Sequence, residues 1–157
     1  MTDTVDTTIT GTDIRRSAMD LLARREHGFQ ELCDKLVRRF GPNPLIRGEV
    51  ERLREEGLQN DVRFAEAYLH SRAQRLYGPM RIRLELRERR IAEEIIENAL
   101  AHAEVDWSKL VYELIWRKFG RKPPETIVER AKRQRFVAYR GFNQFRLDDI
   151  ESDSLAS

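Results

Sequence analysis

Apolar residues recur along this chain at intervals of three and four, the spacing that places them on one side of a helix. No stretch combines sustained period-two alternation with β-branched residues, so the pattern predicts no sheet. The main inward side chains predicted from this spacing are Leu21, Leu22, Leu36, Leu53, Tyr68, Leu69, Ile82, Leu86, Ile96, Leu110, Leu114, Ile115 and Val137. Also on the inward sides fall Val37, Leu45 and Val62. We therefore expect an all-α protein.

Three helices are predicted in the first part of the chain. Thr12 or Asp13 is placed to cap a helix over residues 14–26. A second helix is expected over residues 29–40, and a third ends at about Glu56. The breaks between these helices are marked by Gly28, Gly41, Asn43, Pro44 and Gly57.

The middle of the chain predicts three further helices around a glycine corner. Asn60 is placed to cap the helix that precedes the corner. Gly78 forms the corner, and we expect it to take unusual backbone angles. Pro79 suits the first turn of the next helix, over residues 79–90, and a shorter helix is expected over residues 92–102.

The last part of the chain predicts another three helices. Asp106 is placed to cap the first of them, and Gly120 is placed to end it. The run that begins at Pro123 predicts the start of the second helix. Asn143 is placed to cap the third.

These segments echo one another with a period of roughly 46–50 residues, which indicates a helical repeat array. The pair Leu21 and Leu22, for example, returns as Tyr68 and Leu69. The expected fold is all-α, with three tandem three-helix, helix-turn-helix-like repeats in an elongated, curved array. The expected divisions are a disordered acidic tail over residues 1–12, repeats over residues 13–58, 59–105 and 106–151, and a frayed tail over residues 152–157.

Charge is segregated along the chain, although the formal net charge is only +2. Residues 60–90 hold eight arginines against four acidic residues, a balance of +4. Residues 91–106 hold five acidic residues and no Lys or Arg, a balance of −5. We interpret this pattern as a basic face and an acidic face on different sides of one unit, which do not neutralise each other. The alternative is that these charges only solvate helix surfaces.

Composition narrows the class of protein. The 157 residues are 40% hydrophobic and 36% charged, which leaves enough apolar material for a folded core. No apolar run reaches the ~18 residues of a membrane span, and no secretory leader is visible, so we expect a cytoplasmic protein. Cys33 is the single cysteine and is expected to be an inert packing residue.

Patterns typical of enzymes are absent from the sequence. The three histidines, His27, His70 and His102, do not have the spacing of a metal site. Glu93 and Glu94 are adjacent and would point in different directions on a helix, and no glycine-rich phosphate loop occurs. We expect no catalytic residues, no metal site and no cofactor.

Two motifs together resemble the RecX family, regulators of the RecA recombinase. The first motif joins residues 64–68, FAEAY, and residues 71–75, SRAQR, to the corner over residues 77–82, YGPMRI, and then to residues 84–87, LELR. The second is the sequence RFVAYRGF over residues 135–142. The combination of an aromatic-rich helix, a Gly-Pro corner and a basic helix in this order is specific, whereas each piece alone is weak.

The resemblance covers about residues 14–150 and implies an elongated helical protein without catalytic activity. It implies that the partner is the RecA filament on single-stranded DNA, with the protein lying along the filament groove. It also implies inhibition of filament growth, ATP hydrolysis and recombinase activity in DNA repair and the SOS response. Single-stranded DNA in or near the filament is an expected weak contact. We expect a monomer that does not associate with membranes.

Arginines of the middle segment are the predicted partner-binding residues, because guanidinium groups form charge-assisted contacts with carboxylates and phosphates. They are Arg72, Arg75, Arg81, Arg83, Arg87, Arg89 and Arg90. The alternative is pairing within one helix, of Arg81 with Glu85 and of Arg83 with Glu88.

A second basic run is a candidate nucleic-acid-binding or partner-binding site, consisting of Arg130, Lys132, Arg133, Arg135 and Arg140. Phe136 and Tyr139 are interleaved with it, and basic residues combined with aromatic ones bind single-stranded nucleic acid. Their spacing also fits core packing, which we favour for both, and Tyr77 is likewise expected to pack at the corner. The rival function is therefore a stand-alone helical nucleic-acid-binding module.

Overall fold

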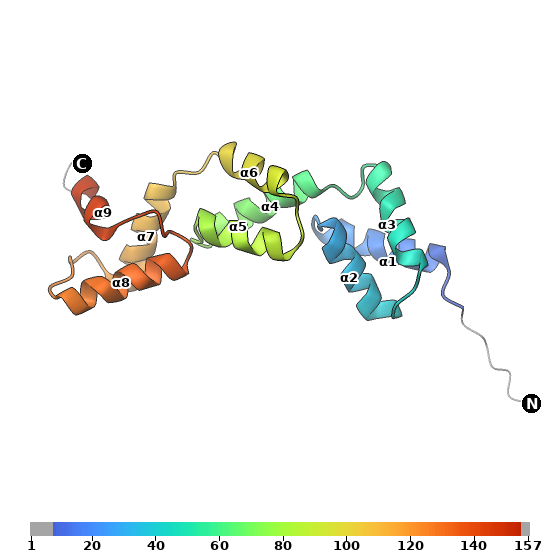
Figure 1. Cartoon of the computed structure of the whole chain (residues 1–157), viewed down its shortest axis with the longest axis horizontal. Helices are drawn as coiled ribbons and strands as arrows, with labels where there is room; N and C mark the ends of the chain where they lie inside the picture. The colour runs from blue at the N-terminus through green and yellow to red at the C-terminus, as the bar shows by residue number, and fades with distance from the viewer. Residues whose placement is uncertain (1–7, 155–157) are drawn as a thin grey trace, which may run out of the picture. The chain divides into compact units, whose positions relative to one another are not determined.

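The computed structural model describes residues 8–154, and that stretch forms nine α-helices (Figure 1). No strand occurs in these residues, which confirms the prediction of an all-α protein. Residues 1–7 and 155–157, which belong to the two predicted tails, lie outside the described part. The chain separates into two compact units, residues 1–64 and residues 65–157. The finer division into three tandem repeats stays a prediction.

The first unit packs three helices around one apolar core. They are α1 (Gly11–Arg24), α2 (Phe29–Phe40) and α3 (Leu45–Glu55). Its buried apolar residues are Ile14, Ala18, Phe29, Leu32, Cys33, Leu36, Ile46, Val50 and Leu53. Burial raises the pKa of the Cys33 thiol, so this cysteine stays protonated and packs as a small apolar side chain.

Helix α1 begins earlier than predicted, inside the stretch that we had assigned to the acidic tail. Thr10 is its N-cap, in place of Thr12 or Asp13. The Asp13 amide donates to the Thr10 hydroxyl over 3.2 Å, and the Thr10 amide donates to the Asp13 carboxylate over 2.9 Å. This reciprocal capping box satisfies two amide groups at the start of the helix, which explains the shift.

The second unit contains most of α4, which starts at the end of the first unit, and the five helices that follow. They are α4 (Asp61–Gln74), α5 (Pro79–Glu88), α6 (Glu93–Ala101), α7 (Trp107–Phe119), α8 (Ile127–Tyr139) and α9 (Leu147–Ser154). One cluster of buried residues joins the end of α4 to α7, α8 and α9, and consists of Leu76, Val111, Leu114, Ile115, Val137, Phe142, Leu147 and Ile150.

Two of the predicted caps in the later helices are confirmed and two predicted starts are wrong. The side chains of Asn60 and Asp106 each accept a hydrogen bond from the amide three residues later, as N-caps do. Helix α8 begins after Thr126, whose hydroxyl caps it, and not at the prolines before it. Helix α9 begins at Leu147, whose amide donates to the Gln134 side chain, so Asn143 does not cap it.

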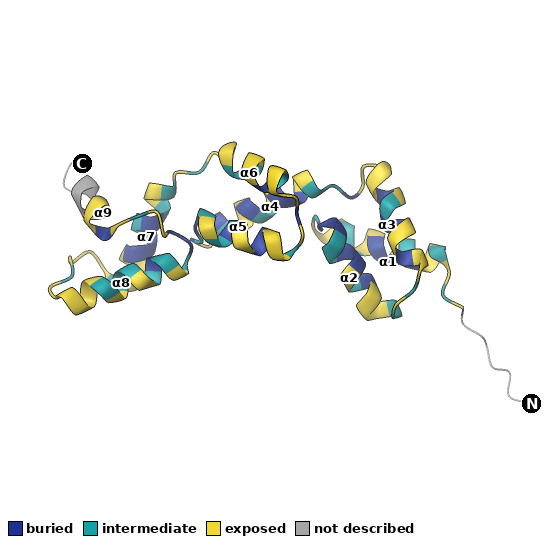
Figure 2. Ribbon diagram, in the orientation of Figure 1, coloured by how far each residue is buried: buried dark blue, intermediate teal, exposed yellow. Residues whose placement is uncertain are grey.

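Most of the predicted inward residues lie on the buried sides of their helices (Figure 2). Val37, Leu45 and Val62 are 39%, 48% and 49% exposed, so these three predictions are wrong. In α4 the buried side instead begins with Phe64, which is 2% exposed. Val62 lies two turns before the buried Leu69 on the same side of the helix, but it belongs to the first turn of α4 and is left exposed there.

Candidate partner-binding surface

Helix α5 places a carboxylate inside the second unit among apolar neighbours. Pro79 occupies its first turn, where the missing amide hydrogen costs nothing. Ile82 and Leu86, four residues apart, are fully buried on one side of the helix. Glu85 lies next to Leu86 and is itself only 9% exposed. A carboxylate at this depth needs charged or hydrogen-bonding partners.

Glu85 accepts hydrogen bonds from three side chains. We call these three side chains and Glu85 the Glu85 cluster. Arg72 binds both carboxylate oxygens, with Nη2 at 2.6 Å from Oε1 and Nε at 2.9 Å from Oε2. The Tyr68 hydroxyl donates to Oε2 over 2.5 Å, and Arg81 Nε donates to Oε1 over 3.1 Å. The cluster ties α4 to α5 by charge-assisted hydrogen bonds.

The cluster fixes the charge states of its members. Burial by itself would raise the pKa of Glu85, but the hydrogen bonds from Arg72, Tyr68 and Arg81 outweigh burial and lower that pKa. Burial, together with the hydrogen bond to Glu85, raises the pKa of Tyr68 to about 12. At neutral pH the carboxylate is therefore ionised and the phenol is protonated.

Three guanidinium groups lie over the Tyr77 ring, and that of Arg81 is the most distant, at 5.7 Å. Arg72 Cζ lies 3.8 Å and Arg140 Cζ 3.9 Å from the ring centroid. Arg140 also donates to the carbonyl oxygens of Leu76 and Arg75, over 3.3 Å and 2.7 Å. Tyr77 is half-buried, so the prediction that it packs at the corner is confirmed. Arg140 is thus engaged with the end of α4, far from its own position in sequence.

Backbone contacts hold the Gly78 corner against the end of α8. The Gly78 amide donates to the Arg140 carbonyl over 2.7 Å, and the Met80 amide donates to the Gly141 carbonyl over 3.1 Å. A Cβ atom on Gly78 would lie 2.4 Å from the Gly141 oxygen, and one on Gly141 would lie 2.4 Å from Arg81 Cβ. Both glycines are required because the two segments approach too closely for any side chain.

The expected reason for glycine at position 78 is therefore wrong. Gly78 has φ −89° and ψ 170°, which any residue adopts. The left-handed conformation at this corner belongs to Leu76, with φ 62°. Close backbone approach, and not an unusual dihedral angle, selects the glycine.

The acidic stretch of α6 pairs with the basic helix. Arg83 Nε lies 2.7 Å from Glu97 Oε1, and Arg87 Nε lies 2.5 Å from Glu93 Oε1. The prediction of two separate faces that do not neutralise each other is therefore wrong. The expected pairing of Arg81 with Glu85 is confirmed, whereas Arg83 pairs with Glu97 and not with Glu88. The packing of α5 against α6 brings together oppositely charged side chains that are separated in sequence.

The remaining arginines of the middle segment differ in their surroundings. Arg75 and Arg90 are exposed, and neither guanidinium group forms a hydrogen bond or an ion pair within the described part of the chain. Arg89 lies over the Tyr68 ring, 4.6 Å from its centroid, and donates to the Glu85 carbonyl. Of the predicted arginines, Arg75 and Arg90 are the ones with guanidinium groups free for a partner.

The second basic run divides in the same way. Arg130 pairs with Asp148, and Arg133 donates to the Lys122 carbonyl over 2.9 Å. The side chains of Lys132 and Arg135 are exposed and without ion pairs among residues 8–154.

The aromatic residues in this run also differ from each other. Phe136 packs edge-on against Phe119, with ring centroids 5.5 Å apart, so core packing is confirmed for it. Tyr139 is 69% exposed, so core packing is wrong for it. Its ring lies under the Arg81 guanidinium, at 4.8 Å.

Only part of this arrangement is predictable from the sequence. The spacing of Arg81 and Glu85 was visible, but the role of Glu85 as the shared acceptor was not, because Tyr68 and Arg72 reach it from another helix. The contact of the Gly78 corner with Arg140 and Gly141 spans more than sixty positions, as the separations of 64 and 65 for the Arg140 hydrogen bonds indicate.

Two other kinds of site are absent from residues 8–154. No group of three or more His, Cys, Asp or Glu residues there is arranged to hold a metal ion. None of the helices in that range has the length and apolar character required to cross a bilayer.

Comparison with known proteins relates the chain to one family. The sequence model described as RecX, second three-helix domain, matches residues 60–100. A protein named Regulatory protein RecX from Pseudomonas putida strain GB-1 is 48% identical over 129 residues, which cover 82% of this chain and 83% of the relative. A protein of the same name from Ectopseudomonas mendocina strain ymp is 46% identical over 130 residues, covering 83% and 87%.

Solved structures agree with the helical fold. The crystal structure of RecX from Lactobacillus salivarius superimposes with a TM-score of 0.67 at 20% identity, over 90% of this chain and 92% of that one. Another crystal structure of regulatory protein RecX gives a TM-score of 0.66 at 23% identity, over 84% and 68%. At these identities the similarity concerns the fold alone.

Proposed function

This chain belongs to the RecX family of regulatory proteins, and from that premise we propose that it regulates RecA by binding its filaments on single-stranded DNA. In this proposal the protein lies along the filament groove and inhibits filament growth, ATP hydrolysis and strand exchange. It acts by binding and not by catalysis. Family membership supports the general role, and the arrangement of the arginines supports the surface through which it acts.

The exposed arginines around α5 are the observation that supports this surface. Arg75 and Arg90 have no ion-pair partner in the described part of the chain. Within residues 8–154 the ion-pair partners of Arg83 and Arg87 are Glu97 and Glu93, which are more than half exposed. Exposed pairs of this kind are weak, so a carboxylate or phosphate of a partner can replace the glutamates.

The half-buried members of the predicted set have a different proposed role. Arg72 and Arg81 are bound to Glu85, and Arg140 is bound to the end of α4. We propose that they shape the surface and do not contact the partner.

A matched pair of variants tests the surface. Arg83 and Arg87 changed together to alanine, and Glu93 and Glu97 changed together to alanine, remove the same two ion pairs. If these pairs serve only the fold, both variants should bind RecA filaments equally well or equally poorly. We expect the arginine variant to bind filaments about tenfold more weakly and the glutamate variant to bind normally. Equal effects would refute the proposed surface.

A second variant tests the arginines without partners. Changing Arg75 and Arg90 to alanine removes no hydrogen bond or ion pair of either guanidinium group within the described residues, so the melting temperature should hardly change. Filament affinity should fall, and filament binding measured by anisotropy would detect this loss. An unchanged affinity would exclude both residues from the interface.

The rival function is a stand-alone nucleic-acid-binding module. It is favoured by one observation, the exposed Lys132, Arg135 and Tyr139 on α8. Affinity for bare single-stranded DNA and for a RecA–DNA filament, measured at the same salt concentration, separates the two functions. The rival is correct if bare DNA binds as tightly as the filament and the ATPase of RecA is unaffected. Binding to bare DNA should weaken as salt rises, because phosphate contacts release counterions.

A further inference from the structure

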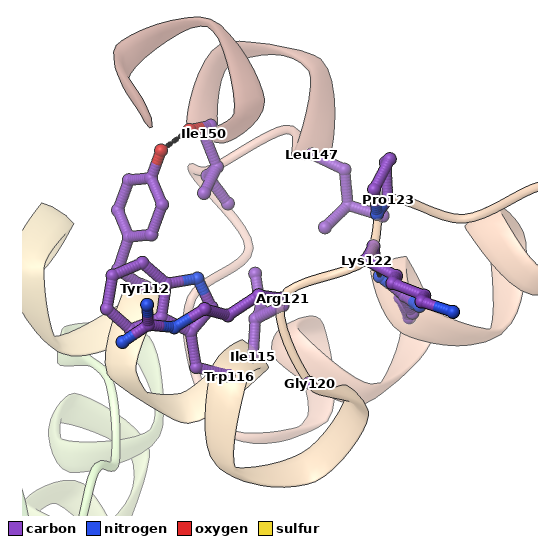
Figure 3. A pocket seen from close by; sticks show the side chains of 10 residues that line it. Tyr112, Ile115, Trp116, Gly120, Arg121, Lys122, Pro123, Leu147 and Ile150 are labelled. Atoms are coloured by element: carbon purple, nitrogen blue, oxygen red, sulfur yellow. Dashed lines mark hydrogen bonds between the residues drawn. The ribbon is translucent and has the colours of Figure 1, made fainter. Parts of the chain in front are cut away.

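A hollow of about 250 Å³ lies in the second unit between α7, the loop after it and α9 (Figure 3). Its floor is apolar. Ile115 comes from α7, while Leu147 and Ile150 come from α9 and point toward it. The hollow lies outside the arginine surface of α5, and none of its lining residues belongs to the predicted α5 set.

Aromatic side chains form one wall of the hollow. Tyr112 and Trp116 pack edge-on, with ring centroids 5.6 Å apart. The Tyr112 hydroxyl donates to the Ile150 carbonyl, which fastens α9 to α7 (Figure 3). Trp116 is nevertheless 44% exposed. A large, partly exposed tryptophan beside an apolar floor is typical of a binding site for an apolar group.

The rim of the hollow is basic. It is lined by Arg121, Lys122 and Arg133, and no acidic residue is among its described lining residues. None of these three cations forms an ion pair in the part of the chain that the structure describes. The charge of this rim therefore remains uncompensated, in contrast to Arg83 and Arg87, which are paired with glutamates.

We propose that this hollow binds an acidic peptide segment of a protein partner, with one bulky apolar side chain of the segment seated on the floor. The basic rim would pair with carboxylates on either side of that side chain. The aliphatic floor favours an apolar side chain over a nucleobase, which stacks on flat aromatic faces. Arg121 already lies over the Trp116 ring, 4.8 Å from its centroid, and would have to leave before a base could stack there. This site is independent of the surface proposed for filament binding.

Labelled synthetic peptides and the full chain test the proposal by fluorescence anisotropy. The probe is a short peptide of Asp and Glu with one central Phe, and its partner probe has Ala in place of Phe. We expect saturable binding of the first, and binding about tenfold weaker for the second, because only the first fills the hollow. Equal binding of both peptides would overturn the proposal, since it would mean that charge alone is recognised.

Variants of the rim complete the test. Arg121→Glu combined with Lys122→Glu should weaken binding of the Phe peptide by about tenfold or more. The control, Arg24→Glu combined with Arg38→Glu, makes the same change of charge on exposed residues of the first unit and should leave binding unchanged. Equal losses would show nonspecific attraction to a basic protein. An oligothymidylate that binds more tightly than the peptide, with the same dependence on Arg121 and Lys122, would assign the hollow to nucleic acid and overturn the proposal.

Discussion

The two units contain the same glycine corner closed by different chemistry. Gly28 precedes α2 and Gly78 precedes α5, both in extended conformation and both without a side-chain cap. In each corner the glycine carbonyl accepts a hydrogen bond from the amide four residues later, that of Leu32 or Ile82. The backbone turn is therefore common to both units.

The first corner is built around a buried histidine and a buried glutamine, and its partners lie no more than 32 positions away. His27 is 1% exposed, and its Nδ1 lies 3.0 Å from the Arg25 carbonyl while its Nε2 lies 3.2 Å from Lys35 Nζ. Gln59 donates to the His27 carbonyl and to Asp61, which also accepts from the Phe29 amide. The imidazole is neutral, because burial lowers its pKa and the nearby Arg25 and Lys35 lower it further.

The second corner is closed by ions and by a distant segment. The Glu85 cluster and the stacking of Arg140 on Tyr77 replace the histidine and amide contacts of the first corner. The turn itself tolerates either solution, and the side chains around it decide how the corner responds to mutation and pH.

The largest expected effect comes from truncating a buried leucine that both corners have in common. Leu36 and Leu86 occupy the same position relative to their corner glycines, and both are fully buried. Changing either to alanine should cost about 2–5 kcal/mol of unfolding free energy, measured by urea denaturation. If one change is nearly neutral, the two cores are not equivalent.

Removing the charge of Glu85 tests the difference between the two corners. Glu85→Gln takes the counter-charge from Arg72 and Arg81 and should cost about 2–3 kcal/mol. Lys35→Met in the first corner should cost less, because the partner it leaves is a neutral imidazole. Glu88→Gln, on the exposed side of the same helix, is the control and should have little effect. Equal losses of stability for Glu85→Gln and Lys35→Met would show that the two corners do not differ in their dependence on ion pairs.

Glycine substitutions test the close backbone approach at the second corner. Gly78→Ala should destabilise the protein by about 1–3 kcal/mol, because the new Cβ meets the Gly141 backbone. Gly48→Ala is the matched control, since a Cβ there meets no atom within 4 Å inside α3. It should stabilise the protein by about 0.5–1 kcal/mol, through the lower entropy of the unfolded chain. Thermal melts of both variants would check the opposite signs.

Acid should affect the two corners in different pH ranges. The pKa of His27 is lowered from 6.5, so near that pH the folded state binds fewer protons than the unfolded state. Stability therefore falls as the pH drops below about 6.5, with a slope of at most about 1.4 kcal/mol per pH unit. The pKa of Glu85 is lowered from 4.5, so its contribution persists above that pH and is lost only below it. His27→Gln should flatten the profile between pH 7 and pH 5.5, and an unchanged profile would assign the effect elsewhere.

Periodicity predicted the helices and most of the core because helical spacing is a local property. One error, the N-cap of α1, is local, and the others fall where a contact between different helices decides. Thr10 displaced the expected caps through its exchange of hydrogen bonds with Asp13, and Gln134 sets the start of α9 from another helix. The ion pairs of Arg83 and Arg87 with α6 could not be predicted from charge balance, since they depend on how two helices face each other.

The candidate sites were predictable to a smaller extent. Sequence pattern identified the arginines but did not distinguish exposed Arg75 from Arg72, which binds the buried Glu85. The basic hollow was not predicted at all, because Trp116, Arg121 and Leu147 are brought together only when α7 and α9 pack.

The hydrogen bonds between the Gly78 corner and the end of α8 give the second unit a built-in reporter of partial opening. The amides of Gly78 and Met80 donate to carbonyls of Arg140 and Gly141, so they exchange with deuterium only when these segments separate. Amides within α4 and α5 are protected by hydrogen bonds of their own helices, so they exchange only when those helices unfold. The ratio of these exchange rates therefore measures how often the corner detaches while its helices stay intact, and a bound partner that holds the corner closed would slow the two amides selectively.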